Sequence, residues 1–223
     1  LETIGVGQNA YHKDDVFAHT MEVLDNTPPD LIARLSAIFH DIGKPRTKTE
    51  DDTGIHFYKH EDVGAEMANV IMHRMKYSNE QIESVNKIVS SHMRLKSSGP
   101  EGNDVSDKAL RKFVAHMGDD LQSAFKLMHA DNISHAENSS MPNQIPTLAN
   151  RISNLTLVVP TKPKLPINGH DILSQFNLNP GPQVKHILAA IEDAWYENPN
   201  LTRDQALQIA GSVIQTNSSS NSL

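Results

Sequence analysis

An apolar helical segment that runs into a histidine–aspartate pair constrains the fold of this chain most. Residues 31–39 repeat apolar side chains at helical spacing, which predicts a helix that is buried on most sides. The segment continues into His40 and Asp41 and then meets Gly43 and Pro45, which favour the end of a helix. The fold must therefore bury this helix and still accommodate a polar pair at its C-terminal end.

The pair is itself a candidate metal site. A neutral imidazole nitrogen and a carboxylate oxygen together suit first-row divalent metals. Because side chains one position apart on a helix point about 100° apart, His40 and Asp41 reach one ion only where the helix end borders a cavity. The alternative is an ordinary polar helix terminus, with His40 near the negative end of the helix dipole.

Composition restricts the kind of metal site. The 223 residues include no cysteine and 12 histidines, which excludes disulfides, iron–sulfur clusters and thiolate zinc sites. No apolar stretch approaches the roughly 20 residues of a membrane span, and the N-terminus does not resemble a signal peptide. We therefore expect a cytoplasmic protein with no membrane partner. The net charge of −7 argues against broad coating of nucleic acid.

Further candidate ligands lie in other predicted helices. His19 falls inside the first helix, His60 begins a later one, and His92 ends the next. Asp131 lies in an apolar-patterned helix, where an unpaired carboxylate is costly. Taken singly, each histidine is more typical of a helix cap, a surface position or a satisfied core residue, and Asp131 is equally typical of a hydrogen-bonded helix residue. Their spread over separate helices is, however, the way in which helical bundles build an internal metal site.

The pattern predicts an all-α protein with several parts. An Asp/Thr/Gly cluster before alternating residues predicts a small hairpin or loop near residues 47–58, which would serve as a lid. The expected parts are a metal-binding domain at 1–155, an extended Pro-rich connector at 156–167, a helical extension packed on the first domain at 168–215, and a disordered tail at 216–223.

The same dipeptide occurs a second time in a different setting. His170 and Asp171 precede an apolar run instead of following one. This order predicts a helix entry capped by Asn168 or Asp171, and we do not expect metal chemistry there.

Five stretches together resemble one known family. They are Phe17-Ala18-His19-Thr20, Phe39-His40-Asp41-Ile42-Gly43-Lys44-Pro45, Phe57-Tyr58-Lys59-His60-Glu61-Asp62-Val63-Gly64-Ala65-Glu66, His92-Met93 and Ala130-Asp131. Their order and neighbours resemble the HD-domain metal-dependent phosphohydrolase superfamily. Within it, the sequence is most similar to the HD region of bacterial CCA-adding enzymes and related poly(A)-polymerase-like proteins. The likeness covers about residues 11–210.

The resemblance implies an all-helical fold and a particular ligand set. The basic metal set of that family corresponds to His19, His40, Asp41 and Asp131. Members that hold two metals add histidines that correspond to His60 and His92, and Asp41 would then bridge both ions. The expected cofactor is one or two divalent ions, drawn from Mn, Ni, Co, Fe, Mg and Zn.

The implied reaction is hydrolysis of a phosphomonoester or phosphodiester on a nucleotide, a cyclic phosphate or an RNA end. A metal-bound hydroxide would be the nucleophile. Asp41 and Lys44 are the expected catalytic residues, and the basic residues expected to contact substrate phosphate are Lys44, Arg46, Lys59 and Arg94. Glu61 is a candidate partner for a ligand imidazole. Each of these side chains is also typical of a solvent-exposed charge near a helix end.

Two other functions are also compatible with the sequence. Some HD proteins with six ligands use two irons for oxygenation. The domain is otherwise read as a tRNA- or RNA-binding module whose metal site is vestigial. The Gly-Gly signal and paired-Asp motif of a nucleotidyltransferase catalytic head are not seen in this sequence, so nucleotide addition is not assigned to this chain.

Overall fold

The computed structural model describes residues 2–9, 12–156 and 163–220, and it confirms a mostly α-helical fold. The α-helices are α1 (Val16–Asn26), α2 (Leu31–Phe39), α3 (Lys44–Thr47), α4 (His60–Arg74), α5 (Asn79–Val89), α6 (Asp107–Met117), α7 (Leu121–Ile133), α8 (Gln144–Thr156), α9 (Gly169–Phe176), α10 (Pro182–Glu197) and α11 (Arg203–Ser220). The strands are β1 (Lys48–Asp51) and β2 (Gly54–Phe57), and the short 3₁₀ turns are η1 (Lys96–Ser98), η2 (Gly118–Asp120) and η3 (Glu137–Ser139).

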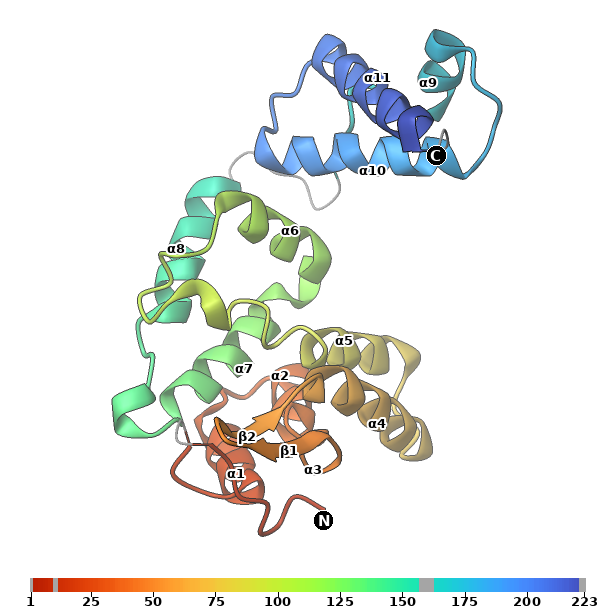
Figure 1. The fold of residues 1–223 in the computed structure, drawn as a ribbon. Helices are drawn as coiled ribbons and strands as arrows, with labels where there is room; N and C mark the ends of the chain where they lie inside the picture. The colour runs from red at the N-terminus through yellow and green to blue at the C-terminus, as the bar shows by residue number, and fades with distance from the viewer. Residues whose placement is uncertain (1, 10–11, 157–162, 221–223) are drawn as a thin grey trace. The chain divides into compact units, whose positions relative to one another are not determined.

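The elements fall into two compact units, the first built from described residues within 1–105 and 117–151. Its central core joins α2, α4 and α5, whose apolar faces meet around Phe39, Met72 and Val85. Helices α1 and α7 also pack on α2 (Figure 1). The apolar helix predicted at 31–39 is thus surrounded by other helices, which places its C-terminal end inside the unit.

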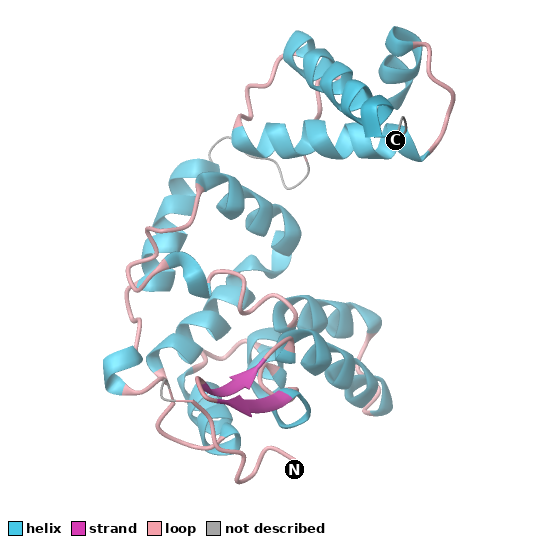
Figure 2. Ribbon diagram, in the orientation of Figure 1, coloured by secondary structure: helices cyan, strands magenta, loops and turns pink. Residues whose placement is uncertain are grey.

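The predicted hairpin near residues 47–58 is confirmed. Strands β1 and β2 pair antiparallel, with Lys48 opposite Phe57 and Asp51 opposite Gly54 (Figure 2). Gly54 has a φ of +118°, a conformation that side chains other than glycine rarely adopt. The carboxylate of Asp51 accepts a hydrogen bond from the backbone N–H of Thr53 and closes the turn.

The segment after α2 differs in detail from the sequence-based expectation. Gly43 has a φ of −77°, so it is not the left-handed glycine that commonly ends a helix. Pro45 does not simply stop the chain but lies in the first turn of α3, where proline is tolerated. A Cβ atom on Gly43 would lie 2.2 Å from the carbonyl oxygen of His60 and 2.7 Å from the nitrogen of Gly64. Glycine is required here because the backbones of this turn and of α4 touch.

The second unit comprises residues 106–116 and the described residues from 152 onward. Its core lies among α9, α10 and α11, around Ile172, Ile187 and Ala206. Helix α6 groups with this unit by contacts, whereas the sequence-based division placed it in the first domain. Residues 157–162 of the predicted connector and 221–223 of the predicted tail lie outside the described residues. Helix α11 extends to Ser220, into the segment for which composition predicts disorder.

The second His-Asp dipeptide is part of a helix cap, as predicted. The Asn168 side chain accepts hydrogen bonds from the backbone N–H groups of His170 and Asp171. The Asp171 carboxylate accepts one from the Asn168 backbone and pairs with Arg203 at 2.9 Å. These contacts are those of a capping box.

Hydropathy along the described helices gives no candidate for a membrane crossing.

Candidate metal centre

Six predicted ligands converge inside the first unit from five helices and the turns that follow them. His40 caps the C-terminal end of α2 and Asp41 follows it, while His60 is the first residue of α4. His92 lies in the turn after α5. All six residues are at most 5% exposed; they are His19, His40, Asp41, His60, His92 and Asp131. The fold therefore removes from water the ligand set that the resemblance implied.

Three of these imidazoles are oriented by the same backbone device. The Nδ1 atoms of His40, His60 and His92 lie 2.8, 2.8 and 2.7 Å from the carbonyl oxygens of Ala37, Phe57 and Val89, each three residues earlier in the chain. A carbonyl oxygen only accepts hydrogen bonds, so each Nδ1 carries the hydrogen. In the neutral ring, Nε2 then presents a lone pair, the arrangement in which histidine binds metals.

The lone pairs face one another and the two carboxylates. The Nε2 atom of His40 lies 3.2 Å from Asp41 Oδ2, and that of His60 lies 3.4 Å from Asp41 Oδ1. His19 Nε2 lies 3.2 Å from Asp131 Oδ1. The Nε2 atoms of His60 and His92 are 3.3 Å apart. Since both rings carry their hydrogen on Nδ1, these two nitrogens cannot hydrogen-bond to each other unless one ring is protonated.

The electrostatics of the centre favour a cation. Burial, helped by His60, lowers the pKa of His92 to about 3, so its ring is neutral at pH 7. Burial alone would raise the pKa of Asp41, but His40 and Lys44 outweigh it and hold the pKa well below its usual range. Burial would lower the pKa of His40, but Asp41 outweighs it and raises the pKa. The Asp41 carboxylate is thus ionised and attracts positive charge, and the neutral His92 ring offers a lone pair beside it.

These observations fit a borderline divalent metal. His40 Nε2 and Asp41 Oδ2 are buried and, among the described residues, neither makes a hydrogen bond of normal geometry, although Lys44 Nζ is in ion-pair contact with Asp41 Oδ2 at 2.7 Å. Two ligand groups form, each with ligand atoms within 4.8 Å of one another: His19, His40 and Asp131, and Asp41, His60 and His92. Nitrogen and oxygen donors in these groups suit Mn, Fe, Co, Ni or Zn better than calcium.

Two lysines lie beside the carboxylates. Lys44 is 5% exposed, pairs with Asp41, and also donates to Gln8 Oε1 at 2.5 Å. Lys96 Nζ lies 2.7 Å from Asp131 Oδ2. Both lysines line a cavity of about 450 Å³ that also reaches His60 and His92. A phosphate entering this cavity would meet two ammonium groups next to the ligand cluster.

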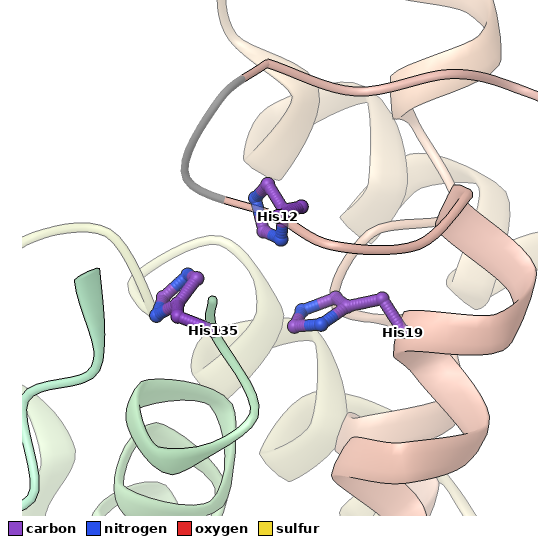
Figure 3. Close-up of side chains that lie close together, drawn as sticks. All are labelled: His12, His19 and His135. Carbon is purple, nitrogen blue, oxygen red and sulfur yellow. The ribbon is translucent and has the colours of Figure 1, made fainter. Parts of the chain in front are cut away.

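Two further histidines, His12 and His135, lie beside His19, and the sequence analysis missed both. We call these three residues the histidine corner. Figure 3 shows His12 and His135 close to His19, with ring centroids 4.5 Å apart for His12–His19 and 4.8 Å apart for His12–His135. His135 is four residues after Asp131, so helical spacing was a usable signal. His12 precedes α1 in an irregular segment and gives no such signal.

This histidine corner is electropositive despite its metal-like geometry. The three rings have ligand atoms within 4.8 Å of one another, but Lys44 Nζ lies 3.3 Å from His12 Nε2. Burial and then Lys44 lower the pKa of His12 to about 2, and burial and then Lys96 lower that of His135 to about 4. The nearby ammonium groups thus disfavour a further cation and favour an anion at this corner.

The other three basic residues predicted to contact substrate phosphate, Arg46, Lys59 and Arg94, do not line the cavity. Arg46 pairs with Glu2 at 3.1 Å in an exposed position. Lys59 and Arg94 are exposed, and neither lines the cavity. Lys96, two residues after Arg94, takes the place at the cavity that the sequence reading gave to the arginine. Glu61 Oε2 lies 3.4 Å from His60 Nδ1, beside the ligand ring.

Acid is expected to destabilise the metal-free protein through His92. Its pKa is 6.5 in the unfolded chain and about 3 in the fold, so between these values only the unfolded state binds the proton. Stability therefore falls as pH falls, by roughly 2 kcal/mol between pH 6.5 and 5. Urea unfolding at pH 7 and pH 5 measures this loss, and a His92→Gln variant should lose less. An equal loss in both proteins would contradict the assignment.

Comparisons with known proteins show the family to which the chain is related. A family described as tRNA nucleotidyltransferase domain 2 matches residues 56–208. The chain is 28% identical over 202 residues to the A-adding tRNA nucleotidyltransferase of Deinococcus radiodurans, covering 85% of this chain and 44% of that protein. It is 30% identical over 211 residues to the CC-adding tRNA nucleotidyltransferase of Thermus thermophilus, covering 91% of this chain and 46% of that protein. The chain thus spans less than half the length of these curated relatives.

Proposed function

Because this chain belongs to the family described as tRNA nucleotidyltransferase domain 2, we propose that it is a tRNA-related module whose buried metal centre hydrolyses phosphate esters of nucleotides or RNA ends. The observation that carries the proposal is the set of three imidazoles whose Nδ1 atoms are held by backbone carbonyls and whose Nε2 atoms face Asp41 or one another. A purely structural core would not require a buried cluster of lone pairs.

The proposal includes membership of the HD-domain superfamily. The ligand order His19, His40-Asp41, His60, His92 and Asp131 is the one that the resemblance implied, and the burial and proximity of these side chains support it. Nucleotide addition is not part of the proposal.

Divalent ions held by these ligands would acidify water and stabilise negative charge on phosphate oxygens. The residues around them have separate tasks. Asp41 contributes its two oxygens to different halves of the cluster, one near His40 and one near His60. Lys44 and Lys96 supply positive charge at the cavity and would orient the phosphate. The burial of Asp41 and Asp131 excludes bulk water and so strengthens each of these interactions.

A phosphatase and phosphodiesterase screen tests the proposal. The protein is stripped of metal, reloaded with Mn²⁺, Ni²⁺ or Co²⁺, and assayed on sugar phosphates, nucleoside monophosphates, 2′,3′-cyclic nucleotides and RNA with terminal phosphates. We expect metal-dependent hydrolysis that is lost in His40→Ala and retained in His170→Ala, which removes the histidine of the other His-Asp dipeptide. Hydrolysis of no ester with any metal, or iron-bound protein with oxygen-dependent turnover, would contradict the proposal.

A second candidate is an RNA-binding module without catalysis. It is favoured by the similarity to the two relatives, both of which are tRNA nucleotidyltransferases. Affinity for tRNA is compared between the wild-type chain and Asp41→Asn. Equal binding in both proteins, without hydrolysis in either, would favour this module over the phosphohydrolase.

Loss of the Lys96 ammonium group is expected to weaken phosphate recognition. Lys96→Met keeps an apolar stem of similar length but removes the charge at the cavity, so kcat/KM for phosphate esters should fall roughly 10- to 100-fold. Arg94→Met is the matched control, because Arg94 is exposed and does not line the cavity. Steady-state kinetics measure kcat/KM for both variants. A larger loss in the Arg94 variant would show that Arg94, and not Lys96, contacts the substrate phosphate.

A further inference from the structure

Two stacked aromatic rings form one wall of the cavity beside the metal centre. His56 lies in β2 and Tyr58 follows it two positions later, so their side chains share a face of the hairpin. Their ring centroids are 5.2 Å apart and their planes differ by 9°. Both rings line the cavity that is also lined by His60 and His92. Tyr58 is 69% exposed, so burial in the core does not explain its position.

The stack is fixed relative to the ligands. His56 Nε2 lies 2.8 Å from Thr53 Oγ1 and 3.1 Å from Asp51 Oδ1, contacts that hold the ring against the hairpin turn. Phe57, between the two in sequence, is buried and lines the same cavity, and its carbonyl oxygen accepts the hydrogen bond that orients His60. A five-residue segment thus carries both the aromatic wall and one ligand of the centre.

The cavity is chemically divided in a way that matches a nucleoside phosphate. Its volume of about 450 Å³ exceeds what a phosphate group needs and lies in the range of small-molecule sites. Lys44, Lys96 and the ligand cluster supply charge, whereas Ile55, Met93 and Met141 contribute apolar lining. A flat ring that is open to the cavity suits the face of a nucleobase, because every base has a face on which aromatic side chains stack.

We propose that the stacked pair His56–Tyr58 binds the base of the nucleoside whose phosphate reaches the metal centre. This inference rests on the proposed function and adds the residues that select a nucleoside over a simple phosphate ester. The base stacks on the exposed face of Tyr58, while His56 supports the ring from behind. The same chemistry serves a free nucleotide and the last nucleoside of an RNA strand.

The experiment measures selectivity. The ratio of kcat/KM for adenosine 5′-monophosphate to that for ribose 5-phosphate, which lacks only the base, is compared between proteins. Tyr58→Ala should lower the ratio about 10- to 100-fold, and Tyr58→Phe, which keeps the ring, should retain it. Met75→Ala is the control, because Met75 is an exposed apolar residue that does not line the cavity. An unchanged ratio in Tyr58→Ala, including one in which kcat/KM falls equally for both substrates, would overturn the proposal.

A binding measurement separates this inference from the proposed function. The fluorescence of a 2-aminopurine ribonucleotide is quenched when its base stacks, so the wild-type protein should quench it and Tyr58→Ala should not. Quenching without any hydrolysis would support base stacking at Tyr58 and contradict the hydrolase proposal. Hydrolysis without quenching would support the hydrolase proposal and contradict base stacking at Tyr58. Repeating the titration with a short RNA that ends in 2-aminopurine distinguishes a free nucleotide from an RNA end by the lower dissociation constant.

Discussion

Replacing Asp41 by asparagine is expected to abolish metal-dependent hydrolysis and to lower the bound metal. Asp41 is the one side chain that approaches His19, His40 and His60 together, with oxygen–nitrogen distances of 3.8, 3.2 and 3.4 Å among the described residues. The amide keeps the shape but removes the negative charge that balances the metal. Because a metal contributes several kcal/mol to charge stabilisation, we expect a loss on the order of 10³-fold or more in kcat. Steady-state assays and elemental analysis measure the two effects.

The other His-Asp pair supplies a matched control for this prediction. Asp171→Asn removes the same carboxylate from a dipeptide of identical sequence, but there it caps α9 and pairs with Arg203. Metal content and hydrolysis should be unchanged, with at most a small loss of stability. If Asp41→Asn retains its metal and its activity while its circular dichroism remains native, the proposal that Asp41 would hold the metal is wrong.

Replacing Gly43 by alanine is expected to be among the most destabilising single-methyl additions in the first unit. The new Cβ would lie 2.2 Å from the carbonyl oxygen of His60 and 2.7 Å from the nitrogen of Gly64. Both obstacles are backbone atoms, so relief requires α4 to shift and to move His60 out of the centre. Overpacking of this kind costs about 3 kcal/mol or more. Denaturant unfolding measures the stability, and metal affinity should fall in the same variant.

Gly64→Ala is the control on the opposite side of the same contact. A Cβ there meets its nearest neighbours at 3.4 and 3.5 Å, close to ordinary van der Waals distance. The substitution also removes a glycine from the interior of α4, which favours the helix by roughly 0.5–1 kcal/mol. We therefore expect no loss of stability in this variant and a gain of at most about 1 kcal/mol. Similar stability losses in the two variants would contradict the account of this contact.

Much of the local structure was predictable because it depends on residues close in sequence. The helical spacing of residues 31–39, the turn before β2 and the cap at Asn168 each follow from rules that act over a few positions. The same rules distinguished His40-Asp41 at the end of an apolar helix from His170-Asp171 at the start of one. The ligand set itself needed the resemblance, because His19, His60 and His92, each taken alone, were more typical of a cap, surface or core position.

The features of the site that the sequence did not predict depend on contacts between distant segments, which periodicity does not encode. Gly43 was read as a helix terminator, but its conformation is ordinary and its role is the close approach to α4. Arg94 and Lys96 are two residues apart in a turn, and only the folded chain decides that Lys96 faces Asp131. His12 reaches the centre from an irregular segment through tertiary structure alone.

Anomalous diffraction from crystals grown with Mn²⁺ or Co²⁺ tests the metal centre most directly. We predict anomalous density near the Asp41 carboxylate and the Nε2 atoms of His60 and His92, and a second peak near His19, His40 and Asp131 when both ligand groups are filled. The Nδ1 atoms should still contact the carbonyl oxygens of Ala37, Phe57 and Val89. Absence of density at Asp41 in crystals soaked with excess metal, or rings turned so that Nδ1 faces the ion, would contradict this prediction.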